Sequence, residues 1–218
     1  MSTFRLVLVP GIITLAVTLL RLTGELSDWS RTFFSPEAGG GLAVVGIAWL
    51  VPIFGIYFAT KLRAAGEELS AGRVLGMSAI AILAFVAVSF AVPTVMGFDP
   101  NQPSLAALGV LVVSSILALA IAYYGTGALG KVLFGYGLVA RIPVILVMLL
   151  AILGNWGTHY DVLPPGVVME VSPWTKWFFI GVVPQITLWM AFTVAVGGLF
   201  GGLALLVAHR QKTAVRTA

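Results

Sequence analysis

Long apolar runs separated by short polar segments dominate the chain. An α-helix needs roughly 18 to 20 apolar residues to cross about 30 Å of hydrocarbon. Runs of about this length or longer lie near residues 4–22, 41–60, 74–96, 104–124, 137–156 and 177–207. The pattern therefore predicts an all-α polytopic membrane protein. We expect a single transmembrane domain over residues 1–218, built as a bundle of about six helices.

Two stretches make the ends of these spans harder to place. The segment 125–137 is rich in glycine, which favours a loop or a frayed helix end between the fourth and fifth spans. The last apolar run is longer than one bilayer crossing, so we expect it to tilt or to project beyond the membrane on the cytoplasmic side.

The composition agrees with a membrane protein. Hydrophobic residues make up 60% of the chain and charged residues only 9%, whereas a soluble domain carries about 25% charged residues. The net charge of +4 comes from basic residues that are scattered between the apolar runs and form no stripe. A nucleic-acid partner is therefore not expected.

The basic residues instead indicate the orientation of the chain, because Lys and Arg near span ends are retained in the cytoplasm during insertion. Every second loop is richer in them. These loops and the two ends carry Arg5, Lys61, Arg63, Arg73, Lys131 with nearby Arg141, Arg210, Lys212 and Arg216. The sequence thus predicts a multi-pass protein of the cell membrane with both termini in the cytoplasm.

Several kinds of chemistry are disfavoured by missing residues. The chain has no cysteine, which excludes thiolate metal sites, dithiol redox chemistry and cysteine nucleophiles. No His, Asp, Glu or mid-span Lys is expected inside the six spans, so haem ligands and a buried Schiff base are lacking. The same absence weakens an ion-coupled carrier. We predict no cofactor and no metal.

The densest polar cluster is the predicted outer loop 155–161. His159 could act there as a base or metal ligand, with Asp161 orienting it or sharing the metal, and with Glu25, Asp28 or Glu170 supplied by neighbouring loops. The alternative is an interfacial loop in which His159 is only solvated. A single histidine is not a motif, so the second interpretation is favoured.

Proline interrupts five spans, and the pair Pro184–Gln185 is the most informative case. A buried amide needs a partner, so Gln185 could line a polar cavity together with Pro184 and Thr187. Alternatively, Gln185 bonds a carbonyl that the proline leaves free.

Small residues on the sixth span allow another helix to approach closely. They are Gly197, Gly198, Gly201 and Gly202. The partner helix could belong to this chain or to another subunit, and an internal partner is the stronger expectation. Arg21 and Glu25 are four residues apart on the first helix and are expected to pair there.

Three functions remain open at this point. The first is a non-catalytic membrane component that binds lipids, other membrane subunits or a second copy of itself, and we predict this one because it needs no chemistry that the sequence lacks. The second is a small uncoupled permease or channel around Pro52, Pro93 and Pro184, with a path lined by Gln185, Thr187, Ser89 and Thr94. The third is an outer-face enzyme that uses His159 and Asp161.

Overall fold

The computed structural model describes residues 2–41, 43–99, 104–163 and 170–217, with side chains as far as residue 208. All regular elements in these ranges are helical, and six helical segments are long and apolar enough to cross a membrane. The predicted all-α bundle of six spans is confirmed. The chain is therefore a multi-pass membrane protein.

The elements in chain order are α1 (Thr3–Leu26), η1 (Ala38–Gly40), η2 (Ile47–Trp49), α2 (Leu50–Ala64), α3 (Ala71–Met96), α4 (Leu105–Gly125), α5 (Ala128–Gly154), α6 (Pro173–Lys176), η3 (Trp177–Val182), α7 (Val183–Ile186) and α8 (Leu188–Thr217). The short elements η1 and η2 are single turns of 3-10 helix, whereas η3 is π-helical. The elements α6 to α8 together form the sixth span.

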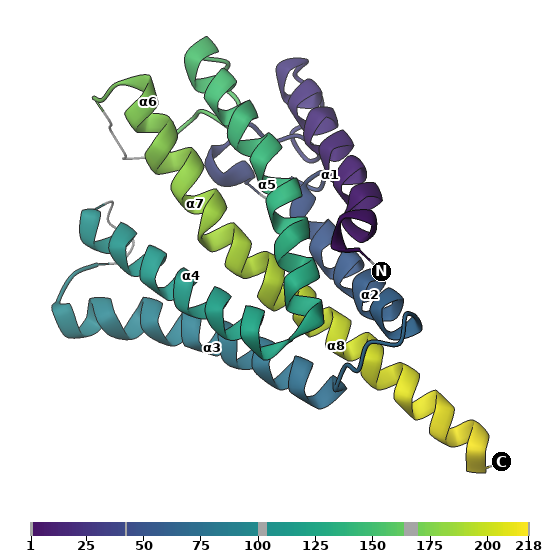
Figure 1. The fold of residues 1–218 in the computed structure, drawn as a ribbon. Coiled ribbons are helices and arrows are strands. Elements are labelled where there is room, and N and C mark those ends of the chain that lie inside the picture. The colour runs from purple at the N-terminus through teal and green to yellow at the C-terminus, as the bar shows by residue number, and fades with distance from the viewer. Residues whose placement is uncertain (1, 42, 100–103, 164–169, 218) are drawn as a thin grey trace.

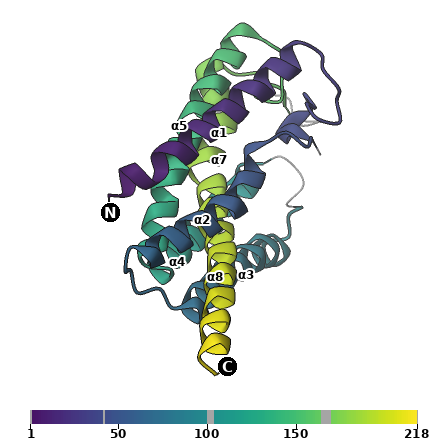
Figure 2. The ribbon, with the colours of Figure 1, turned by 90° about the vertical axis from the view of Figure 1, so that its right-hand side faces the viewer.

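Helix α8 is the centre of the bundle, in contact with α2, α3, α4 and α5 (Figures 1 and 2). Helix α1 packs on α5, where Thr14 and Tyr136 share a buried hydrogen bond of 2.8 Å. Helices α3 and α4 form a hairpin whose far half diverges from α5 and α7 (Figure 1). The C-terminal end of α8 extends past the other helices, as its length predicted.

Two of the predicted packing glycines let α8 lie directly against α2. A Cβ atom on Gly55 of α2 would overlap the carbonyl oxygen of Gly197, and one on Gly201 would lie 2.8 Å from the carbonyl oxygen of Gly55. The contact is between the main-chain atoms of the two helices. An added side chain could therefore be accommodated only if a whole helix moved.

The other two glycines of the motif face α3. A Cβ atom on Gly198 would overlap the Ser78 hydroxyl, and one on Gly202 would lie 2.8 Å from Leu75. All four glycines thus have close neighbours inside this chain.

Two span starts differ from the prediction by more than a few residues. The second span begins at Ile47 instead of residue 41, because Gly39, Gly40 and Gly41 have positive φ angles that end any helix. The fifth span begins at Ala128 instead of residue 137, and only Thr126 and Gly127 break the path from α4.

The glycine-rich segment 125–137 is therefore mostly helical. Its apolar residues Leu129, Leu133 and Tyr136 are fully or almost fully buried in the core. Burial of a large side chain contributes about 1.5–3 kcal/mol, whereas a glycine in a helix costs roughly 1 kcal/mol. Packing thus outweighs the local preference for a loop.

Candidate functional site

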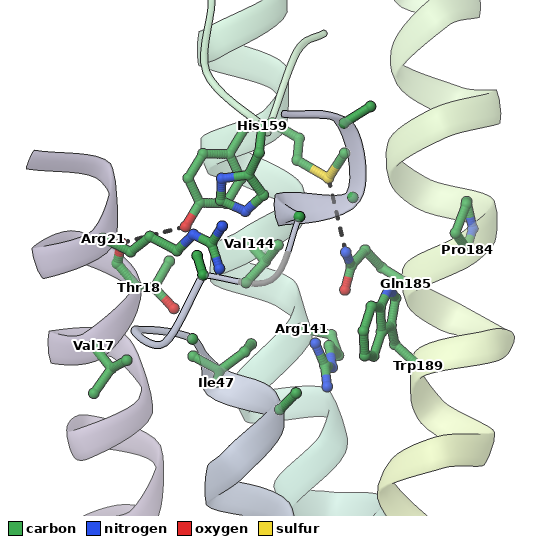
Figure 3. Close-up of a pocket in the computed structure, with 18 of the residues that line it drawn as sticks. Val17, Thr18, Arg21, Ile47, Arg141, Val144, His159, Pro184, Gln185 and Trp189 are labelled. Atoms are coloured by element: carbon green, nitrogen blue, oxygen red, sulfur yellow. Dashed lines mark hydrogen bonds between the residues drawn. The ribbon is translucent and has the colours of Figure 1, made fainter. Parts of the chain in front are cut away.

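A cavity of about 540 Å³ lies inside the bundle (Figure 3). Its walls come from α1, the segment 38–49, α5, the loop 159–162 and the region where α7 meets α8. Most of the lining is apolar. Its polar side chains are Thr18, Arg21, Arg141, His159, Tyr160 and Gln185.

Arg21 and Glu25 form the predicted pair, but the pair is buried. Arg21 Nε donates to Glu25 Oε1 at 2.8 Å, and the Glu25 side chain is fully buried. The two terminal nitrogens of Arg21 donate to the carbonyl oxygens of Ser35, Gly40 and Val45, at 3.2, 2.9 and 2.9 Å. Arg21 therefore holds Ser35, Gly40 and Val45 close to the end of α1 through these hydrogen bonds.

Gly40 has to be a glycine for this arrangement. Its φ is +85°, and a Cβ atom there would lie 2.6 Å from a terminal nitrogen of Arg21. The glycines of segment 38–46 thus allow main-chain carbonyls to approach the Arg21 guanidinium group. If this segment were helical, those carbonyls would bond within the helix instead.

Glu25 also holds His159 through both its oxygens. The main-chain N–H of His159 donates to Oε2 at 2.9 Å, and the ring Nδ1 lies 2.5 Å from Oε1. His159 is not merely solvated, since its side chain is only 16% exposed. The favoured interpretation of this loop was therefore wrong. So was the expectation that no acidic residue lies in a span, because Glu25 belongs to the last turn of α1.

Asp161 shapes the loop and does not contact the His159 ring through any hydrogen bond in the described structure. Its carboxylate accepts from the N–H of Gly157 at 2.9 Å and from the N–H and hydroxyl of Thr158, both at 2.7 Å. This turn sets the position of His159. Asp28 is exposed and lies outside the cavity lining. Of the predicted acidic partners, Glu25 alone bonds His159.

The surroundings of His159 favour the neutral form of its ring. Burial lowers the pKa of His159 below its ordinary value, and the hydrogen bond with Glu25 opposes that shift only in part. The ring is therefore neutral at neutral pH. Since a carboxylate can only accept, the ring proton is assigned to Nδ1. The other nitrogen, Nε2, then carries a lone pair and no hydrogen.

Arg141 lies midway along α5 and is only 3% exposed. Its guanidinium group lies over the ring of Trp189, with 4.8 Å from Cζ to the ring centroid. Its Nε has no hydrogen-bond partner, and neither of the ion pairs among the described residues includes Arg141. The expectation that Arg141 lies beside a cytoplasmic loop is wrong, because the fifth span already begins at Ala128.

Gln185 and Pro184 belong to the cavity lining, and Gln185 lies beside Trp189 (Figure 3). The Gln185 Nε2 is 3.9 Å from Met148 Sδ, and its buried Oε1 has no hydrogen-bond partner among the described residues. Thr187 instead donates to the carbonyl of Val183 at 2.8 Å, at the break between α7 and α8, and is not part of the lining.

The permease path expected from the sequence is only partly present. Ser89 donates to Ser114 between α3 and α4, and Thr94 donates to the Phe90 carbonyl on an exposed face. Neither residue, nor Pro52 or Pro93, lines the cavity around Gln185.

Within the described part of the chain, no group of three or more His, Cys, Asp or Glu side chains could hold a metal ion. The group that sequence reasoning missed is Arg141. The signal was its position, because the predicted span 137–156 already contains Arg141 and a cation within a span usually has a function.

The comparisons with known proteins provide no relative for this chain. No protein family, curated protein or solved structure matches it. Its function is therefore inferred from the cavity and its residues.

Proposed function

We propose that this protein is a non-catalytic membrane component that binds an anionic amphiphile in the cavity, with Arg141 as the cation that meets the anionic group. The observation that carries the proposal is the buried guanidinium of Arg141, which has no acidic partner among the described residues. Such a charge at the centre of a membrane helix costs about 2.5–3.5 kcal/mol. A bound anion would offset this cost.

The start of the second span supports an anion at the same place. Ile47, Ala48 and Trp49 line the cavity, and no side chain caps the helix at Gly46 or Trp49. The first N–H groups of a helix have no partner within the helix, and its dipole places partial positive charge there. A helix end inside the bilayer is a favourable position for an anionic group.

The rest of the lining indicates that the ligand is amphiphilic. Apolar residues surround the two arginines in the lining, among them Val17, Ile47, Val144, Met148 and Ile180. The volume of about 540 Å³ lies within the usual range for small-molecule sites. A phosphate of a membrane lipid and the carboxylate of a free fatty acid share the required chemistry, and we favour the lipid because it surrounds the protein.

Binding can be measured by native mass spectrometry of the detergent-purified protein with phosphatidylglycerol, oleate or phosphatidylcholine of matched chains. We expect phosphatidylglycerol to bind at least tenfold more tightly than phosphatidylcholine. Arg141→Met should remove most of this preference. Lys131→Met removes the same charge from an exposed position at the start of α5 and should preserve it.

Equal binding of the two phospholipids, or an unchanged preference in Arg141→Met, would contradict the proposal. Oleate binding more tightly than both phospholipids would assign the cavity to a free fatty acid and overturn the choice of a lipid phosphate.

A carrier for the same anion is the second candidate, because the cavity lies where two spans are interrupted. The second span begins beside it, and the sixth breaks at Thr187 near Gln185. Carriers commonly bind substrates at such broken helices. Flux of the bound anion into proteoliposomes, lost in Arg141→Met, would favour transport over binding alone. Binding to other membrane subunits or to a second copy stays a prediction.

The orientation also remains a proposal, with both termini cytoplasmic and the His159 end facing outward. The absence of cysteine makes it easy to test. Ser30→Cys and Ala65→Cys lie at exposed positions on opposite ends of the bundle. In intact cells, an impermeant maleimide should label the first variant only, and labelling of the second alone would reverse the orientation.

A further inference from the structure

We propose that the ligand carries a hydroxyl group near its anionic group, and that Nε2 of His159 accepts a hydrogen bond from this hydroxyl. The inference rests on the proposed function and specifies the chemistry of its ligand. It assigns His159 the role of a specificity-determining residue in the same cavity that contains Arg141.

Contacts with Glu25 and Tyr160 fix the position of the His159 ring. Glu25 holds both the ring Nδ1 and the main-chain N–H of His159, and the Tyr160 ring packs against it with centroids 3.8 Å apart. The ring therefore cannot turn to exchange its two nitrogens without losing the Glu25 contact. Nε2 remains without a hydrogen-bond partner among the described residues, on a side chain that lines the cavity.

A neutral ring whose Nδ1 donates to a carboxylate has only an acceptor at Nε2. The occupant of the cavity should therefore present a donor, and the donors considered for a lipid head are a hydroxyl and an ammonium group. A ligand without a donor would cover this nitrogen and leave it unsatisfied.

The charges around the ring favour the hydroxyl. Arg21 lies close enough to oppose a second positive charge at His159. Glu25 is fully buried behind Arg21 and His159, and the Asp161 oxygens are bonded to Gly157 and Thr158. No carboxylate of this cluster is thus left to pair with an ammonium group. The ligand class is an anionic amphiphile with a hydroxylated head.

The test compares two anionic lipids with the same acyl chains. Phosphatidylglycerol has hydroxyl groups on its head, whereas phosphatidylmethanol has the same phosphodiester charge and none. A hydrogen bond to a neutral group changes affinity by about 3- to 10-fold. We expect the wild-type protein to prefer phosphatidylglycerol by this factor in competition binding, with phosphatidylcholine as the reference.

His159→Asn is the informative variant. Its side-chain amide can still donate to Glu25 from the place of Nδ1, but it offers no acceptor at the place of Nε2. We expect an unchanged affinity for phosphatidylmethanol and equal affinities for the two anionic lipids. His159→Phe, which loses the Glu25 contact as well, should show the same equal affinities if its melting temperature remains close to that of the wild type.

The outcomes separate the two proposals. If neither anionic lipid binds more tightly than phosphatidylcholine, the proposed function fails. If both bind tightly and equally to the wild type, or if His159→Asn keeps the preference for phosphatidylglycerol, only the hydroxyl inference is overturned.

Discussion

Replacing Arg141 by methionine is expected to make the ligand-free protein more stable while removing its response to an anionic lipid. The side chain is 3% exposed and has no acidic partner among the described residues, so its charge is uncompensated when the cavity is empty. Methionine has a similar length and suits the apolar surroundings. Removal of buried charge in favour of apolar packing can stabilise a protein by about 1–4 kcal/mol.

The measurement is the thermal midpoint of the purified protein with and without phosphatidylglycerol. We expect the lipid to raise the thermal midpoint of the wild type. The midpoint of Arg141→Met should be higher than that of the wild type without lipid, and the lipid should not raise it further. Lys131→Met should behave like the wild type. A lower midpoint for Arg141→Met without ligand would mean that the guanidinium group supports the fold, and the proposal would then lose its basis.

The second large effect is expected where α2 and α8 meet. Gly55→Ala would place a methyl group on the carbonyl oxygen of Gly197, which belongs to the backbone and cannot move aside. Overpacking a tight core typically costs about 1–3 kcal/mol, and we expect the upper end of this range. The yield of monodisperse protein in size-exclusion chromatography should fall sharply.

Gly76→Ala in α3 is the matched control, because a Cβ atom there has nothing within 4 Å. This variant should be neutral or more stable, since alanine favours a helix by about 1 kcal/mol. Similar yields for both variants would contradict the close packing of α2 and α8. Substitutions at Gly198 and Gly202 should likewise disturb the fold itself, because both face α3.

The six spans could be predicted because the length of an apolar run is a local property of the sequence. Their ends could not be predicted as well. Gly39, Gly40 and Gly41 delay the start of the second span, whereas burial of Leu129 and Leu133 starts the fifth span early. Both outcomes depend on contacts with residues far away in the sequence.

Arg141 was missed as a site residue because it was interpreted together with Lys131 as a topology signal. The predicted span 137–156 already contained it, but close to the start, whereas α5 begins at Ala128 and places Arg141 midway along the helix. Its meaning changes from a topology signal to the central cation of the cavity. Lys131 at the start of α5 remains part of the basis for the predicted orientation, but Arg141 no longer contributes to it.

The sequence provided the members of the His159 cluster but not their arrangement. Glu25 and His159 are 134 positions apart, and only the packing of α1 on α5 brings them into contact. Asp161 was a sensible partner for His159 by proximity along the chain. Its neighbours Gly157 and Thr158 offer three donors within the turn, which is why its carboxylate is used there.

The most direct test of the central proposal is a crystal structure of the protein purified with phosphatidylglycerol. We expect the lipid phosphate inside the cavity, within hydrogen-bond distance of the Arg141 guanidinium group. An empty cavity with the lipid bound elsewhere, or Arg141 paired with a carboxylate of the protein itself, would contradict the proposal.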